Sequence, residues 1–474
     1  MNSDTVLNGL IGDSGSGAAL PKWARANGPA MLLVASFILF GARMFQLISD
    51  YAVNIFFSDQ WEFNDATLFQ KHSLWQMFVW QHGPHRQGLG ALFSRLVDPP
   101  IHWNSRIESF IVGGVVVVAA ICALCLKKRL YGPFSVFDIA IPAIFFTPGQ
   151  WETLVLTPNF AHGSFPLLLL IVYCLAWTVR PAFVRYALIL LINFVTIFTG
   201  FGLLLGILTP ALLVLDHMAG STETRLPTAY LVCAVLFSVA SFAFFFYGYK
   251  FKPYLECFSF QPLSARSYLA YVALMCANFF AFSGTRGIPL FAGLAILITL
   301  LAAMVIAARR LLLPGRLDLH AGDNLRSLIP LILISYSLLF CVSTAYGRLC
   351  GGFWSAQSSR YVIYLELAML GLYFQLLHNR RTSKQRLLLA GFLALVITAS
   401  LAVDKSEMTY FQYVKQEWKA CYMQTENIIG CNQFIGFAIF SRAPEEIHLQ
   451  EKLQYLKATR QNLYLDSPAP ERRR

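Results

Sequence analysis

Long apolar runs recur along this chain, and they constrain its fold more than any other feature. A helix needs about 20 apolar residues to cross a bilayer, and roughly eleven segments reach or approach that length. Charged residues make up only 13% of the sequence, whereas soluble domains carry about 25%. The sequence therefore predicts an all-α integral membrane protein with about eleven transmembrane helices.

Basic residues are grouped between the apolar runs, and this grouping predicts the topology. The net charge is +12, and short basic clusters between spans are the positive-inside pattern of membrane proteins. Lys22 and Arg25 precede the first run, so residues 1–28 are expected to be a disordered cytoplasmic tail. The same pattern argues against a nucleic-acid partner.

The spans are placed by alternating these basic clusters between the two sides of the membrane. A core at 29–402 follows the tail, residues 49–106 form an outer loop, and residues 403–474 form an outer C-terminal subdomain. The expected spans cover residues 29–48, 107–126, 134–148, the stretch before Arg180, 184–199, 201–216, 226–247, 288–308, 327–345, 361–378 and 387–402.

Residues 267–283 are apolar but do not fit as a span. A full crossing here would place Arg309 and Arg310 outside, against the positive-inside rule. We therefore interpret this stretch as an interfacial or re-entrant helix.

The first outer loop carries helical periodicity of its own. Apolar residues recur on one helix face before and after Gly83-Pro84, which predicts two amphipathic helices lying in the membrane interface around a turn. The residues that carry this pattern are Leu68, Leu74, Trp75, Phe78 and Val79, followed by Leu89, Leu92, Phe93, Leu96 and Val97.

Two of the ten cysteines lie in the polar C-terminal tail. Most of the others fall inside apolar runs, where they act as small buried hydrophobes. If the tail is outside the cytoplasm, Cys421 and Cys431 can form a disulfide.

A cluster of polar and aromatic residues directly after the first span is the first candidate for chemistry. Asp59 stands at the outer membrane end, where a carboxylate is costly unless it has a use. It could act as general base toward an acceptor hydroxyl or amine. The alternative is that Asp59 only caps the helix that starts nearby.

Further polar residues of the same loop could contact a substrate. Trp61 and Glu62 follow Asp59, and His82, His85 and Arg86 surround the turn. Two imidazoles with one carboxylate are weak evidence for zinc, so no metal site is predicted. Contact with a phosphate or a sugar hydroxyl is the favoured interpretation, and interfacial packing is the alternative.

The second outer loop adds Gln150, Glu152 and Asn159. With Asp59 these residues would form a polar ring beside an aromatic platform, which is the usual composition of a sugar-binding cleft. Glu152 could instead be an ordinary loop charge.

Several arginines lie at the outer ends of predicted spans, although the positive-inside rule favours basic residues on the cytoplasmic side. Arg348 and Arg360 flank the outer segment before the tenth span, and Arg286 and Lys250 belong to the same rim. Arginine suits bidentate recognition of phosphate, so a lipid-linked phosphate is the expected partner. Snorkelling to lipid headgroups is the alternative.

Taken together, these residues resemble the GT-C type of polytopic membrane glycosyltransferase. The resemblance covers residues 29–402 and rests on Asp59 after the first span, the stretch HGPHRQGL with its amphipathic helices, Glu152 in the second outer loop, and the basic outer site. It implies an inverting transfer from a polyprenyl-phosphate sugar, with Asp59 as the carboxylate that deprotonates the acceptor. Arg348 and Arg360 match only the general idea of a donor-phosphate site. Gln60 stands where the class often has a second acid, which counts against a metal-dependent variant.

The expected function is therefore sugar transfer to a cell-envelope glycan or lipid at the outer face of a bacterial inner membrane. The N-terminus would be cytoplasmic and the C-terminus periplasmic, with membrane lipids as neighbours. Two alternatives stay open: a transporter or flippase for a lipid-linked saccharide, and an envelope glycan polymerase or ligase. Transporters favour charged sites at the midplane, whereas the charges here gather at the outer ends.

Overall fold

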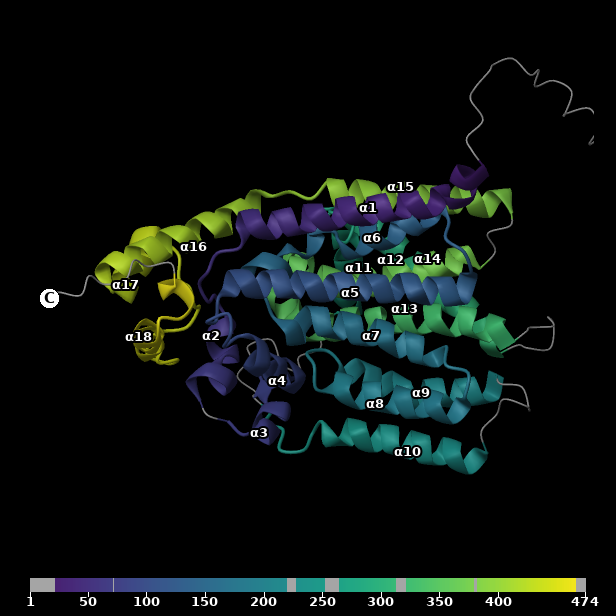
Figure 1. Ribbon diagram of the computed structural model, residues 1–474, viewed down its shortest axis with the longest axis horizontal. Helices are drawn as coiled ribbons and strands as arrows, with labels where there is room; N and C mark the ends of the chain where they lie inside the picture. The colour runs from purple at the N-terminus through teal and green to yellow at the C-terminus, as the bar shows by residue number, and fades with distance from the viewer. Residues whose placement is uncertain are drawn as a thin grey trace, which may run out of the picture.

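The protein is a bundle of long helices that run side by side (Figure 1). The computed structural model describes residues 22–70, 72–219, 227–251, 264–312, 321–378 and 382–465. The predicted all-α fold is confirmed, and several long apolar helices indicate a membrane-embedded protein. The bundle helices are α1 (Lys22–Tyr51), α5 (Ser105–Tyr131), α6 (Ala140–Phe145), α7 (Phe165–Trp177), α8 (Ala182–Ile197), α9 (Leu203–Ala219), α10 (Thr228–Phe244), α11 (Ala265–Asn278), α12 (Ile288–Leu312), α13 (Ala321–Arg348), α14 (Val362–Leu377) and α15 (Ser383–Leu401).

Among the described residues, seven helical segments are long and apolar enough to cross a membrane. They are Asn27–Tyr51, Ser105–Tyr131, Phe160–Trp177, Ile288–Leu312, Asn324–Gly351, Ser359–Leu377 and Ser383–Thr425. Helices α6, α8, α9 and α10 occupy the four remaining predicted spans but belong to shorter apolar segments. The total of eleven spans therefore stays a prediction.

Both end segments of the prediction extend beyond the described residues, which stop at residue 465 of the expected C-terminal subdomain 403–474. Residues 1–21 of the expected tail lie outside the described residues, and residues 22–28 already form the first turns of α1. Helix α11 covers most of the apolar stretch at 267–283. It has only 14 residues, and residues 271–277 are all buried within the bundle, which favours a re-entrant position over an interfacial one.

Helix α5 shows how the local sequence sets the helix ends. The Asn104 side chain accepts hydrogen bonds from the backbone N–H groups of Arg106 and Ile107 at 3.0 and 3.2 Å, and so caps the helix start. At the other end Gly132 adopts a φ of +78°, a conformation that glycine accepts without strain.

The first loop, residues 52–104, gathers at one end of the bundle (Figure 1). It contains short elements: α2 (Gln60–Phe63), a π turn (Asp65–Phe69), α3 (Leu74–Phe78), the hairpin strands β1 (Gln81–His82) and β2 (His85–Arg86), and α4 (Gly88–Val97). Short helices thus flank the turn at Gly83-Pro84, but two amphipathic helices lying in the membrane interface stay a prediction. The first of them is interrupted, however, because Leu68 lies in the separate π turn and α3 starts anew at a capping box of Ser73 and Gln76.

Two glycines hold the hairpin and α4 against their neighbours. A Cβ atom on Gly88 would lie 1.6 Å from the carbonyl oxygen of Phe78, and one on Gly90 would lie 2.5 Å from the Cβ of Ala161. Any larger residue would therefore push α4 away from α3 and from the second loop, residues 146–164. This contact brings the two loops together at one end of the bundle.

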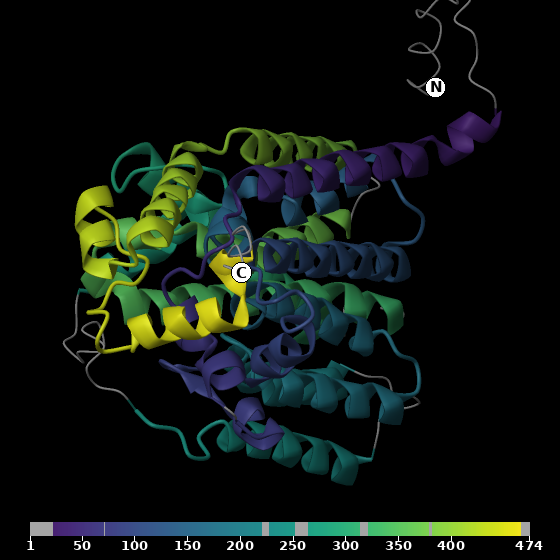
Figure 2. The ribbon, with the colours of Figure 1, turned by 60° about the vertical axis from the view of Figure 1, so that its left-hand side comes forward.

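The C-terminal subdomain packs on the same end of the bundle (Figure 2). It consists of α16 (Ser406–Thr425), α17 (Ile428–Ile435), α18 (Leu449–Thr459) and a turn at Asn462–Tyr464. A disulfide joins Cys421 to Cys431, as the sequence allows. Because α1 begins at the opposite end of the bundle (Figure 1), the two ends of the described chain lie on opposite sides.

Among the described residues, the subdomain shares its apolar core with the first loop. Val53, Phe56 and Trp61 of the loop share one buried cluster with Trp418 and Leu453 of the subdomain. The two segments therefore depend on each other for burial of their apolar surface.

A buried amide adds polar contacts to this shared core. The fully buried Asn462 side chain accepts from the backbone N–H of Phe56 at 3.3 Å, and donates to the carbonyl of Trp103 at 2.7 Å and the hydroxyl of Ser105 at 3.0 Å. The backbone carbonyl of Asn462 also accepts a hydrogen bond from the side-chain amide of Asn54 at 2.8 Å.

Replacing Asn462 by alanine should destabilise the docked subdomain. The change leaves buried backbone groups without partners, so we expect a loss of roughly 2–4 kcal/mol in the free energy of unfolding. Asn427→Ala is the control, because Asn427 makes one exposed N-cap bond to Gly430 and should cost only about 1 kcal/mol. Unfolding in lipid nanodiscs, followed by tryptophan fluorescence, measures both. Equal losses would contradict the role given to Asn462.

Candidate functional site

A cavity of about 950 Å³ opens at the end of the bundle that carries the loops. Its volume falls within the range of ligand-binding pockets. The first loop, the second loop, the ends of α10, α13 and α14, and the C-terminal subdomain all contribute to its wall. The predicted site residues that line it are Asp59, Glu62, His82, His85, Asn159, Arg348 and Arg360.

Asp59 presents an exposed carboxylate to this cavity. It occupies the N-cap position of α2, yet its side chain makes no capping hydrogen bond. The neighbouring Gln60 ties down the backbone instead: its Oε1 accepts from the N–H of Phe57 at 3.0 Å, and its Nε2 donates to the carbonyl of Pro158 at 3.3 Å. The alternative of a purely capping Asp59 is therefore wrong.

Arg360 is held at one edge of its guanidinium and open at the other. Its Nε lies 3.4 Å from a carboxylate oxygen of Glu152 and 3.0 Å from the hydroxyl of Ser358. The same Glu152 oxygen accepts from the Arg360 backbone N–H at 2.8 Å. The two terminal nitrogens make no hydrogen bond to the described residues, and the side chain is 52% exposed. Those nitrogens are the pair that binds phosphate oxygens.

Arg348 adds a second positive charge to the same wall. It is the last residue of α13, where a cation is favoured by the helix dipole. Its guanidinium is exposed and makes no hydrogen bond or ion pair within the described ranges. Two arginines with free donor groups thus share one cavity with the Asp59 carboxylate.

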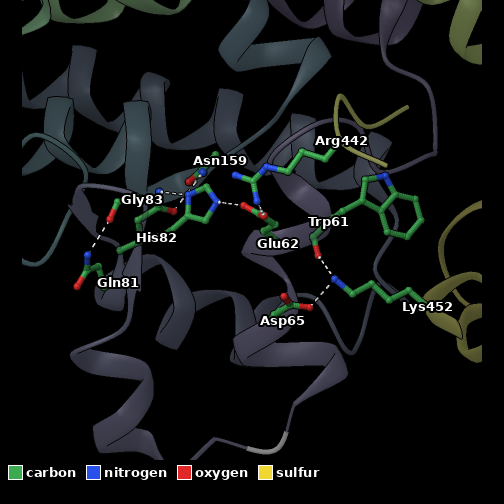
Figure 3. A network of polar contacts seen from close by, with 10 residues as sticks. Trp61, Glu62, Asp65, Gln81, His82, Gly83, Asn159, Arg442 and Lys452 are labelled. Atoms are coloured by element: carbon green, nitrogen blue, oxygen red, sulfur yellow. Dashed lines mark hydrogen bonds and ion pairs between the residues drawn. The ribbon is translucent and has the colours of Figure 1, made fainter. Parts of the chain in front are cut away.

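The hairpin brings a connected set of polar side chains to the cavity (Figure 3). His82 Nε2 lies 3.0 Å from Glu62, and Glu62 also accepts from Arg442 of the C-terminal subdomain at 2.8 Å. On its other side, His82 Nδ1 lies 3.3 Å from the amide nitrogen of Gln87. Gln87 in turn accepts from Asn159 at 3.4 Å.

His85 faces the cavity as a neutral ring. Burial lowers the pKa of His85 to about 3, and the charges of His82 and Arg348 act in the same direction. The ring packs against His162 and Phe201, with centroid distances of 4.8 and 4.5 Å. It can therefore offer a hydrogen bond to a ligand but no positive charge near neutral pH.

Three residues predicted to bind substrate have supporting positions instead. Trp61 is fully buried and packs edge-on against Phe56 in the shared core, because the α2 turn points it away from the face of Asp59 and Glu62. Gln150 is buried and donates to the carbonyl of Phe145 at 2.6 Å. Glu152 holds Arg360 in place and does not itself line the cavity.

The other basic residues of the prediction lie outside the cavity wall. Arg86 is buried and donates to backbone carbonyls of Phe245, Tyr247 and Val79, so it anchors the hairpin to the segment after α10. The backbone of Lys250 is bonded to the side chain of Gln81, and its own side chain is exposed outside the cavity. Arg286 is exposed and does not line the cavity.

Several wall residues are absent from the sequence-based prediction. His162, Tyr361 and Tyr364 line the cavity, and Arg442 and Glu446 lie on the wall from the C-terminal subdomain. Tyr361 follows Arg360 directly and could have been found from that neighbour. Arg442 has no local signal, since its contact with Glu62 joins residues 380 positions apart.

Comparisons of the chain with protein-family models, with curated proteins and with solved structures give no match. Within the described ranges, no group of three or more His, Cys, Asp or Glu side chains is arranged to hold a metal ion. A functional proposal therefore depends on the residues of the cavity itself.

The neutral state of His85 predicts a specific acid dependence of stability. An unfolded chain protonates this ring below pH 6.5, whereas the folded protein does so only near pH 3. The unfolded state thus binds more protons in that window, and His85 makes stability fall as the pH drops from 6.5 toward 3. We expect His85→Gln to unfold with a shallower acid dependence than the wild type.

Thermal unfolding measured at several pH values between 3 and 7 checks this, with the exposed His448→Gln as control. If His85→Gln and the wild type lose thermal stability equally as the pH falls, the ring is protonated in the folded protein.

Proposed function

We propose that the protein is a membrane glycosyltransferase that moves a sugar from a polyprenyl-phosphate donor to a cell-envelope glycan or lipid acceptor. One observation carries the proposal: the Asp59 carboxylate, the Arg348 guanidinium and the terminal nitrogens of Arg360 line the same cavity and have no hydrogen-bond partner among the described residues. A base for the acceptor and cations for a phosphate leaving group are the two functions that such a transfer needs.

The arginines are suited to the donor phosphate. Glu152 fixes the Nε edge of Arg360 and so orients its two terminal nitrogens without using them. A pre-oriented guanidinium loses little entropy when it binds two phosphate oxygens. Arg348 supplies a second charge for the dianion that forms as the donor bond breaks.

An apolar part of the wall suits the lipid portion of the donor. It is formed by Phe201, Leu203 and Leu204 at the start of α9 and by Phe245 and Phe246 after α10. Phe246 is 51% exposed on the outside of the bundle, so this side of the cavity faces both the site and the surroundings of the helices. A prenyl chain can lie there while its phosphate contacts the arginines.

The proposed reaction is a single displacement. The Asp59 carboxylate takes the proton from the acceptor hydroxyl, and the acceptor oxygen forms a bond to the anomeric carbon of the sugar. The bond between that carbon and the phosphate oxygen breaks, and polyprenyl phosphate leaves with its charge neutralised by Arg348 and Arg360. Attack from the side opposite the leaving group inverts the anomeric configuration.

The same proposal includes the topology. Eleven spans would place the N-terminus in the cytoplasm and the cavity with the C-terminal subdomain on the periplasmic side of a bacterial inner membrane. The odd number agrees with the start of α1 and the C-terminal helices lying at opposite ends of the bundle (Figure 1).

Replacing Asp59 by asparagine tests the base. We expect the rate of transfer to fall about 10²–10⁴-fold, because an amide cannot accept the acceptor proton. The measurement is restoration of the envelope glycan in cells that lack the gene, with protein level checked. Asp50→Asn is the matched control, since Asp50 is an exposed carboxylate near the same end of α1 that does not line the cavity. Full activity of Asp59→Asn would refute the proposed base.

Replacing Arg348 or Arg360 by alanine tests the phosphate site. A hydrogen bond to a charged group contributes about 1.5–3 kcal/mol, so each change should weaken binding of polyprenyl phosphate about 10–100-fold. Titration of polyprenyl monophosphate into the purified protein in nanodiscs gives the affinity. Arg286→Ala, outside the cavity, is the control. Unchanged affinity in both variants would exclude the phosphate site.

A second candidate, a flippase for a lipid-linked saccharide, is favoured by one residue of α14. Glu366 is fully buried, and neither carboxylate oxygen has a hydrogen-bond partner among the described residues. Buried ionisable groups in membrane helices often belong to ion or proton pathways. If Asp59→Asn keeps its activity and Glu366→Gln stops movement of a labelled lipid-linked sugar across proteoliposomes, this second function is the correct one.

A further inference from the structure

The side chains around His82 form one continuous hydrogen-bonded chain along the cavity wall (Figure 3). It begins at Asn159 in the second loop, passes through Gln87, His82 and Glu62 in the first loop, and ends at Arg442 in the C-terminal subdomain. Three segments that are far apart in the sequence therefore meet in a single line of contacts.

The direction of every hydrogen bond in this chain follows from its two ends. Asn159 Oδ1 accepts from the backbone N–H groups of Ala161 and His162 at 2.9 and 3.2 Å, so it caps the turn there. This leaves only the Asn159 amide nitrogen to face Gln87. Gln87 must then accept with its oxygen and present its nitrogen to His82.

The same logic fixes the tautomer of His82. Because Gln87 donates to Nδ1, that nitrogen carries the lone pair, and the proton of the neutral ring lies on Nε2 toward Glu62. At the other end Arg442 can only donate, so it occupies the second oxygen of Glu62 and turns the first toward His82. Helix capping at the Asn159 end and the acceptor-only carboxylate of Glu62, whose other oxygen is bonded to Arg442, thus select one tautomer.

We infer that Arg442 is a positioning residue for the part of the cavity around His82, where the acceptor would bind. It holds Glu62 so that His82 presents an unprotonated Nδ1, in place of the long contact from Gln87, to a hydroxyl of a glycan acceptor. Docking of the C-terminal subdomain thereby completes the site. The inference depends on the proposed transfer for the identity of the acceptor, whereas the tautomer itself does not.

A second ion pair between the same two segments separates positioning from mere docking. Lys452 of α18 lies 2.7 Å from Asp65 and donates to the carbonyl of Trp61 at 3.0 Å. It links the subdomain to the first loop as Arg442 does, but it does not line the cavity. A residue that only fastens the subdomain should behave like Lys452 in every measurement.

The test uses the full chain in lipid nanodiscs with ¹⁵N-labelled histidine. Ring nitrogen shifts report which nitrogen carries the proton, and the signals missing from His82→Gln assign those of His82. We expect the wild type to show a protonated Nε2 and a bare Nδ1. Arg442→Ala should give a mixture of both tautomers, and Arg442→Lys should restore most of the original signal.

Lys452→Ala is the matched control. It should lower the midpoint of thermal unfolding at least as much as Arg442→Ala while leaving the His82 signals unchanged. If Arg442→Ala leaves the single tautomer intact, or if Lys452→Ala disturbs it equally, Arg442 has no positioning role.

Kinetics separate this inference from the proposed function. With a working transfer assay, Arg442→Ala should raise the KM for the acceptor several-fold with a smaller change in kcat, whereas Asp59→Asn lowers kcat. An active Asp59→Asn together with the expected tautomer shift in Arg442→Ala would refute the base and keep the positioning role. The reverse pair of results would refute the positioning role alone.

Discussion

The buried amide of Asn462 is the contact on which the geometry of the cavity depends. It binds the backbone at Phe56, 406 positions earlier, and reaches the start of α5 through Trp103 and Ser105. Phe56 lies three residues before Asp59, so the carboxylate that faces the cavity is positioned from the other end of the chain. A buried amide that satisfies several groups at once specifies one arrangement, because any other would leave those groups without partners.

Some charges of the site are paired with each other, and others remain available to a ligand. Glu152 forms an ion pair with Arg360, and Arg442 forms one with Glu62. Asp59 and the terminal nitrogens of Arg360 keep their hydrogen-bonding capacity for a ligand. A partly exposed ion pair adds little stability by itself, so the effect of Glu152 and Arg442 is best understood as orientation of the groups beside them.

The sequence predicted the helices well because their signal is local. Apolar runs located the described bundle helices, although the number of spans stays a prediction, and these signals can mislead in detail. Lys127 stands in a basic run with Lys128 and Arg129 at the end of the second predicted span, yet its side chain is buried in an ion pair with Asp138 at 2.7 Å. The face of a short turn was less predictable still: Trp61 and Glu62 are neighbours, and one lies in the core while the other lines the cavity.

The residues that sequence reasoning missed or misassigned share a physical cause. Arg360 with Glu152 and Arg442 with Glu62 are contacts between residues 208 and 380 positions apart, and no periodicity or spacing joins such partners. Composition could show that acids and arginines gather near one end of the spans, but it could not show which of them neutralise each other. That pairing decides which charges are left for chemistry. Among the described residues, it leaves Asp59 as a cavity carboxylate without a hydrogen-bond partner, and Arg348 and Arg360 as cations with unused donor groups.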